Sequence, residues 1–100
     1  MKVVIIGTGE VGFHVAKALS EENYDITVVD NDPAKCQRAS EHLDVIVVEG
    51  NGASPKVLID AKVNDADYVL CLTRVDEVNL IASQQSHELG AKKIITRLRN

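Results

Sequence analysis

Hydrophobic residues in this chain gather into short runs, and longer stretches with helical spacing separate them. The first run covers residues 3–6 and is apolar at every position, as expected of a strand that is buried on both faces. Comparable runs recur along the chain, so the pattern predicts strands over residues 2–6, 25–30, 44–50, 67–73 and 92–98.

Helical periodicity is clearest directly after the first strand. An apolar residue recurs there at positions i, i+4, i+7 and i+8, which predicts a helix that ends near residues 22–23. The residues of this stripe are Val11, Val15, Ala18 and Leu19. A later helix is predicted to begin with Asp76 as its cap and to run to about Leu89, where Gly90 ends it.

Two prolines mark the starts of two further helices. Asp32 precedes Pro33, and Ser54 precedes Pro55. Each pair places a capping side chain before a proline at the first helical position, where the missing amide hydrogen is not needed. The predicted helices cover residues 33–42 and 55–61.

The predicted order is therefore β-α-β-α-β-α-β-α-β. Strict alternation requires crossover connections, and these produce a mostly parallel sheet with helices on both faces. The fold class is thus α/β, a Rossmann-like doubly wound sheet, in a single domain over residues 1–100. Because such folds usually continue with another helix and strand, we expect a fragment of a longer protein or a domain completed by a partner.

Three glycines follow the first strand in the pattern G-x-G-x-x-G. Gly7 allows a tight turn, Gly9 lets a pyrophosphate approach the backbone, and Gly12 lets the helix lie close to the strand. The helix N-terminus then offers unpaired N–H groups to an anion. The pattern alone is weak, and a simple turn between strand and helix is the alternative. A preceding strand, a following helix and a well-placed acid strengthen it.

That acid is Asp30, at the end of the second predicted strand. Its carboxylate can accept hydrogen bonds from both hydroxyls of an adenosine ribose, and it would repel a 2′-phosphate. No arginine follows that would receive such a phosphate, so the sequence favours NAD(H) over NADP(H). A capping or surface aspartate is the alternative. Glu10 is expected to point away from the pyrophosphate.

Composition narrows the classes of partner. The 100 residues are 45% hydrophobic with a net charge of −4, and only one Phe and two Tyr are present. A nucleic-acid binder would show a basic face or stacking aromatics, so none is expected. No apolar stretch approaches the ~20 residues of a membrane helix, and we expect a cytoplasmic chain without direct membrane insertion.

Cys36 and Cys71 are expected to be reduced and buried, and no metal site is predicted.

Longer segments resemble a known family. They are "GTGEVGFHVAKALSEENYDITVVDNDP", "VEGNGASPKVLIDAKVNDADYVLCLT" and "DEVNLIASQQSHELGAKKIITRLRN". Together they are similar to the KTN, or RCK N-terminal, NAD-binding regulatory domain of Trk-type potassium-uptake systems. The resemblance implies a ligand sensor that binds NAD(H), or ATP/ADP as in relatives, and alters the gating of a potassium channel or transporter at the cytoplasmic face of the membrane.

The resemblance also implies roles for particular residues. Gly7, Gly9 and Gly12, with Thr8, Glu10 and Val11 between them, would line the pyrophosphate. Asp30 would hold the adenosine ribose beside Asn31, and the adenine edge would meet Asn51, Gly52 and Ala53. Thr73 and Arg74 would face the second ribose or the phosphates, and the site mouth would hold Glu77, Asn79 and Arg97.

Several of these residues have other interpretations. The family usually has aspartate where this chain has Asn51; an amide can accept from adenine and also donate to it, but Asn51 could instead be a turn residue. Thr73 could be an ordinary strand residue without a binding role, and Arg97 could be an arginine at a strand end whose charged group reaches water. Glu77 and Asn79 could be residues of the first turn of a helix.

Two other classes of function remain to be weighed. The cofactor-binding half of an NAD-dependent dehydrogenase would need a placed acid or base, and His14, His42 and His87 have no neighbour in sequence that would orient them. No catalytic residue is therefore predicted.

An assembly module is the other class, because a fifth strand leaves an open edge beside a helix with the apolar residues Leu80, Ile81, Ala82 and Leu89. A dimer or higher homo-oligomer is expected.

Overall fold

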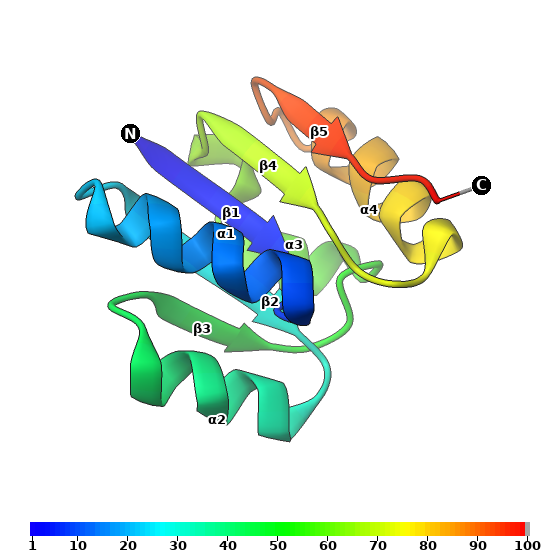
Figure 1. The fold of residues 1–100 in the computed structure, drawn as a ribbon. Coiled ribbons are helices and arrows are strands. Elements are labelled where there is room, and N and C mark those ends of the chain that lie inside the picture. Colours follow the sequence, from blue (N-terminus) through cyan, green and yellow to red (C-terminus); the bar gives the residue numbers. More distant parts are fainter. Residues whose placement is uncertain (100) are drawn as a thin grey trace.

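The computed structural model describes residues 1–99 and consists of alternating strands and helices (Figure 1). The alternation predicted from sequence is confirmed, with a short 3₁₀ turn over Val63–Asp65 added before the fourth strand. In chain order the elements are β1 (Lys2–Ile6), α1 (Glu10–Glu21), β2 (Asp25–Asp30), α2 (Pro33–His42), β3 (Ile46–Glu49), α3 (Pro55–Asp60), β4 (Tyr68–Cys71), α4 (Asp76–Glu88) and β5 (Ile94–Thr96).

The five strands form one parallel sheet in the order β3-β2-β1-β4-β5. The chain moves outward from β1 to β2 and β3, and then returns to the other side of β1 for β4. This reversal makes the space between the carboxyl ends of β1 and β4 a topological switch point, where doubly wound sheets bind ligands.

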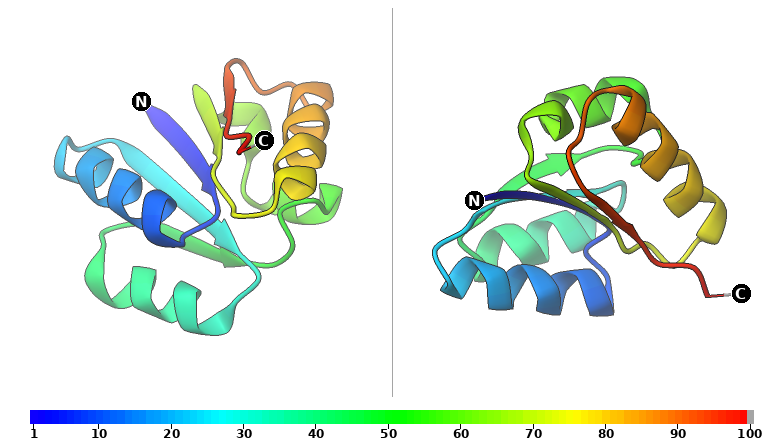
Figure 2. Two further views of the ribbon diagram at one scale, coloured as in Figure 1. Left: turned by 45° about the vertical axis from the view of Figure 1, so that its right-hand side comes forward. Right: turned by 90° about the horizontal axis from the view of Figure 1, so that it is seen from above.

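Helices cover both faces of the sheet, with α1 and α2 on one side and α3 and α4 on the other (Figure 2). The alternating residues of β1 serve both layers. Val3 and Ile5 pack in the cluster that includes Ala16 of α1, whereas Val4 and Ile6 pack in the cluster that includes Leu58 of α3. All four β1 side chains are at most 2% exposed, so the apolar run is explained by burial on both faces.

The orientation of α1 differs from the stripe that its sequence suggested. Val11 and Ala18 are exposed, and the fully buried positions are Gly12, Phe13 and Ala16. The cause is the contact between helix and turn, because a Cβ on Gly12 would lie only 1.8 Å from the carbonyl oxygen of Gly7. The helix turns Gly12 toward this close contact, and Val11 is left beside the glycine turn.

Of the three predicted helix caps, one is confirmed, one is confirmed in position but makes no capping bond, and one is wrong. Asp32 caps α2 as expected, since its Oδ1 accepts the N–H of Ala34 at 2.9 Å. Ser54 occupies the N-cap position of α3 but its side chain makes no capping bond. Asp76 is the first residue of α4 rather than its cap, and its carboxylate accepts the backbone N–H of Arg99.

Three strands are shorter than predicted, and the edge at β5 is largely apolar. The sequence predicted strands over residues 44–50, 67–73 and 92–98, whereas β3, β4 and β5 span four, four and three residues. Ile95 of β5 and Leu80 and Ile81 of α4 are 44–54% exposed. Ala82 and Leu89, expected on the same exposed face, instead pack into the core.

Candidate functional site

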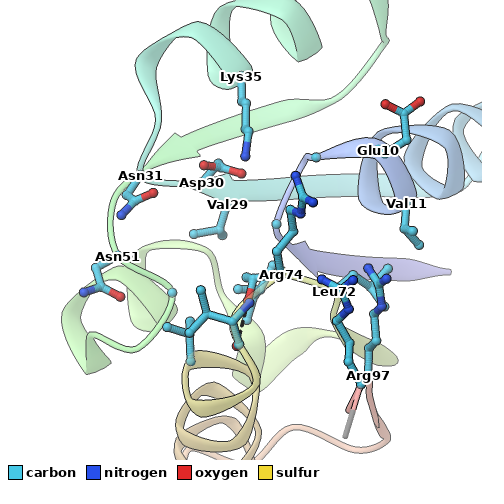
Figure 3. Close-up of a pocket in the computed structure, with 18 residues that line it drawn as sticks. Glu10, Val11, Val29, Asp30, Asn31, Lys35, Asn51, Leu72, Arg74 and Arg97 are labelled. Carbon is cyan, nitrogen blue, oxygen red and sulfur yellow. Dashed lines mark hydrogen bonds between the residues drawn. The ribbon is translucent and has the colours of Figure 1, made fainter.

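A cavity of about 610 Å³ opens at the carboxyl ends of the strands, within the usual size range of ligand sites (Figure 3). It lies at the switch point between β1 and β4. The loops that follow these two strands meet there, since a Cβ on Gly7 would lie 2.8 Å from the backbone nitrogen of Thr73. The sheet topology therefore brings together residues that are far apart in sequence.

The glycine turn forms the floor of this cavity and adopts the geometry expected from its sequence. Gly7 has φ of +102°, a conformation that side-chain-bearing residues rarely adopt. Above Gly9 there is room, and among the described residues that are not its chain neighbours, the Nζ of Lys35 lies within 4 Å of a Cβ built there, at 3.8 Å. No side chain caps α1, so the N–H groups of its first turn remain available to an anion.

Asp30 links the glycine turn to the start of α2. Its Oδ2 accepts the N–H of Thr8 at 2.8 Å and lies 3.3 Å from the Thr8 hydroxyl, while its Oδ1 accepts the N–H of Asp32. A carboxylate offers about four lone-pair sites, so capacity remains for a ligand hydroxyl. The residue thus organises the turn in addition to facing the cavity.

Asn79 is buried beneath the site instead of standing at its mouth as predicted. Its Oδ1 accepts the N–H of Thr73 at 2.9 Å and faces the Thr73 hydroxyl at 2.8 Å. Its Nδ2 donates to the carbonyls of Thr73 at 3.0 Å and Arg97 at 2.9 Å. The side chain is 0% exposed, and it fastens the loop after β4 to the chain after β5.

Most of the residues predicted for a cofactor site line the cavity. They are Gly7, Gly9, Glu10, Val11, Asp30, Asn31, Asn51, Gly52, Thr73, Arg74 and Arg97. Thr8, Gly12, Ala53, Glu77 and Asn79 do not line it. Thr8 and Gly12 support the turn from behind, and Glu77 is exposed at the start of α4. Glu10 points to solvent as expected, where it pairs with His14.

Asn51 combines two of its suggested roles. Its Oδ1 accepts the N–H of Ala53 at 2.8 Å, which is the bond of a turn-forming asparagine. The side chain also lines the cavity next to Gly52. A Cβ on Gly52 would lie 2.4 Å from Cγ2 of Ile6, so the turn packs tightly on the end of β1.

Sequence reasoning missed two basic residues of the cavity, Lys35 and Arg99. Lys35 comes from α2, outside every segment of the glycine motif. Arg99 lies two residues after Arg97. In an extended chain, residues two apart point to the same side, and this spacing is the sequence signal that could have placed both arginines at the cavity. Within residues 1–99 the carboxylate ion pairs are His14–Glu10 and Lys92–Asp67, so the cavity cations make none.

Both cysteines are buried free thiols, as predicted. Burial raises the pKa of Cys71 to about 11, although hydrogen bonds from Ser83 and Thr96 oppose the shift. Burial, and then the nearby carboxylates led by Asp30, raise the pKa of Cys36. Neither thiol is activated for chemistry, and residues 1–99 contain no cluster of His, Cys, Asp or Glu able to hold a metal.

The fold and cavity define a class. This is a Rossmann-like α/β domain with a ligand-sized cavity at the switch point, floored by a glycine turn and a helix N-terminus. The chain belongs to the TrkA-N domain family, whose family pattern matches residues 3–100. The family resemblance noted from the sequence is confirmed.

Curated relatives carry the same domain in longer chains. The chain is 44% identical over 100 residues to the Trk system potassium uptake protein TrkA homolog of Archaeoglobus fulgidus. It is 43% identical over 101 residues to the Trk system potassium uptake protein TrkA of Haemophilus influenzae. Each match covers 100% of this chain and 22% of the relative, so the chain spans about a fifth of their length.

Solved structures with the same fold are more distant in sequence. The Kef CTD of Shewanella denitrificans in its AMP-bound form matches with a TM-score of 0.80 and 23% identity, over 95% of this chain and 57% of that one. The TrkA-N domain of the inner membrane protein ybaL from Escherichia coli matches with a TM-score of 0.71 and 16% identity, over 95% and 86%. Such likeness confirms the fold class. Among residues 1–99, no helix has the length and apolar character needed to cross a membrane.

Proposed function

We propose that this chain is the nucleotide-binding regulatory domain of a potassium-uptake system and that it binds NAD(H) in the switch-point cavity. Membership of the TrkA-N family supports this function, as do relatives that are named Trk system potassium uptake proteins. The main support for nucleotide binding is the cavity, because an uncapped helix N-terminus and the carboxylate of Asp30 both face it.

The proposed pose follows from the chemistry of the lining residues. The diphosphate lies over the glycine turn, where backbone N–H groups and the partial positive charge of α1 stabilise it. Asp30 accepts from the adenosine ribose, and the adenine lies toward Asn51 and Gly52. The remaining ribose or phosphates extend toward Thr73, Arg74 and Arg97. ATP and ADP share the adenosine and phosphates, and the AMP-bound Kef CTD has the same fold.

Regulation requires that the nucleotide bind one arrangement of subunits more tightly than another. We propose that the domain forms a dimer or higher homo-oligomer on the cytoplasmic side of a membrane potassium transporter or channel, without entering the membrane. The exposed apolar residues near β5 support self-association, namely Leu80, Ile81, Ile95 and Leu98. The domain acts as a sensor and not as an enzyme, so the nucleotide is released unchanged.

A nucleotide panel tests this function. Thermal unfolding is followed with NADH, NAD⁺, NADPH, ATP and ADP, and titration calorimetry measures each affinity. A ligand at 100 times its dissociation constant should stabilise the folded chain by about 2.7 kcal/mol. We expect NAD(H) to stabilise and NADPH to do so less, because the carboxylate of Asp30 repels a 2′-phosphate.

The matched variants are Asp30→Ala and Asp32→Ala, which remove neighbouring carboxylates. Asp30 lines the cavity and Asp32 does not, so NADH affinity should fall in the first variant alone. No stabilisation of the wild-type chain by any of these nucleotides would overturn the proposal. Oxidation of NADH in the presence of a small carbonyl compound would favour a dehydrogenase instead.

A further inference from the structure

Lys35 reaches the cavity from a part of the chain that carries no nucleotide motif. It lies in the first turn of α2, is partly buried, and lines the cavity. Its Nζ stands 3.8 Å from the position that a Cβ on Gly9 would occupy. The ammonium therefore lies next to the place where the missing side chain of Gly9 leaves room for a ligand to approach the backbone, and Figure 3 shows Lys35 extending from α2 into the cavity.

The surroundings of Lys35 in α2 include the N-cap carboxylate of Asp32, which accepts the N–H of Ala34 and offsets part of the positive charge of the helix N-terminus. A cation in the first turn of a helix is opposed by the partial positive charge of the helix N-terminus. Among residues 1–99, Lys35 makes no ion pair that would compensate for this repulsion. A residue that breaks a local rule without a structural gain is typical of a functional position.

A second cation faces the same spot. Figure 3 shows Arg74, from the loop after β4, extending toward the glycine turn from the side opposite Lys35. Arg97 and Arg99 also line the cavity, so four basic side chains line it together with the carboxylate of Asp30, while the carboxylate of Glu10 pairs with His14 at the surface. The cavity is thus locally basic in a chain whose net charge is −4. Among the described residues, Lys35 and Arg74 make no ion pair, so both charges remain available to an anion that enters the cavity.

We infer that Lys35 is a phosphate-binding residue, which holds the phosphate nearest the glycine turn from the α2 side while Arg74 approaches from the other. This inference rests on the proposed function and extends it. The phosphate is then bound by a charged side chain as well as by backbone N–H groups, so the affinity depends on the charge of the phosphate. Nucleotides that carry a phosphate at this point depend on Lys35, whereas adenosine does not.

The experiment compares the wild-type protein with Lys35→Met, Lys35→Arg and the control Lys17→Met. Lys17 is an exposed lysine of α1 that does not line the cavity, so its substitution removes the same charge elsewhere. Titration calorimetry measures the affinity of each protein for ADP, NADH and adenosine at low and high salt. Thermal unfolding without ligand reports the stability of each fold.

Lys35→Met should weaken ADP and NADH by about tenfold or more, because a charge-assisted hydrogen bond is lost. Adenosine affinity should not change, and Lys35→Arg should retain most of the affinity. The salt dependence of ADP binding should become shallower. Without ligand, Lys35→Met should melt at the wild-type temperature or above it, since an unfavourable helix charge is gone.

Three results would overturn the inference while leaving the proposed function standing. ADP affinity of Lys35→Met equal to that of Lys17→Met would show that the ammonium touches no phosphate. An equal loss for adenosine and ADP would show an effect through the fold, as would a lower melting temperature of the free protein. Failure of the wild type to bind any of the three ligands would instead overturn the proposed function itself.

Discussion

Asn79 holds the site together through all the hydrogen bonds that its amide can make. Its oxygen accepts from the N–H and faces the hydroxyl of Thr73, and its nitrogen donates to the carbonyls of Thr73 and Arg97. Replacing it by alanine removes these four contacts at a fully buried position. The carbonyl of Arg97 and the N–H and carbonyl of Thr73 then lose the partner that Asn79 provides.

The expected loss in the free energy of unfolding follows from the number of hydrogen bonds removed. Each intramolecular hydrogen bond contributes about 1 kcal/mol net, and a buried group left without a partner costs about 1–3 kcal/mol. Because Thr73 is partly exposed, water can replace some of the bonds, so we expect a loss of about 3 kcal/mol. For a domain of this size, that lowers the melting temperature by at least about 12 °C.

Urea unfolding followed by circular dichroism measures this change for Asn79→Ala beside the control Asn64→Ala. Asn64 is exposed, and its substitution should alter the free energy of unfolding by less than about 0.5 kcal/mol. Asn79→Asp keeps the acceptor but turns a carboxylate toward two carbonyl oxygens, so its stability should recover as the pH falls and the acid becomes protonated. A loss below about 1 kcal/mol for Asn79→Ala would refute the argument, because the four bonds would then carry no net energy.

Three other expectations follow from the packing, the caps and the buried thiols. Gly12→Ala would place a methyl group 1.8 Å from the carbonyl oxygen of Gly7, so this variant should lose more than about 4 kcal/mol or fail to fold, as circular dichroism would show. Asp32→Ala should cost about 1 kcal/mol in urea unfolding because it removes a helix cap, whereas Ser54→Ala should cost almost nothing; equal losses would contradict the assignment of caps. Because burial raises the pKa of Cys71 from 9.0 to about 11, the buried thiol contributes its full stability below pH 9, and about 2–3 kcal/mol of this is lost as the pH rises to 11. The fall in the free energy of unfolding should be smaller by this amount in Cys71→Ala, where Cys36 remains.

The order of elements could be predicted from the sequence because it depends on local patterns. The apolar run of residues 3–6 needs two covered faces, and Asp32 with Pro33 favours a helix start through a side-chain cap and a fixed φ, both of which are local. The structural roles of Gly7 and Gly12 are predictable because they depend on the backbone alone: Gly7 adopts a positive φ, and Gly12 allows the helix to lie close to the turn. The sequence overestimates the lengths of β3, β4 and β5, because strand ends depend on pairing with neighbouring strands, which local patterns do not show.

The arrangement around the cavity was decided by tertiary structure. Lys35 from α2 and Arg99 from the chain after β5 meet Arg74, which the sequence does predict, at the switch point. No pattern in the sequence shows that α2 directs a lysine toward the glycine turn. Asn79 was misplaced for the same reason, because its four partners lie six and eighteen residues away. Local residue types determine which elements form and where the backbone can turn, whereas side-chain contacts between distant segments exist once the sheet order has brought those segments together.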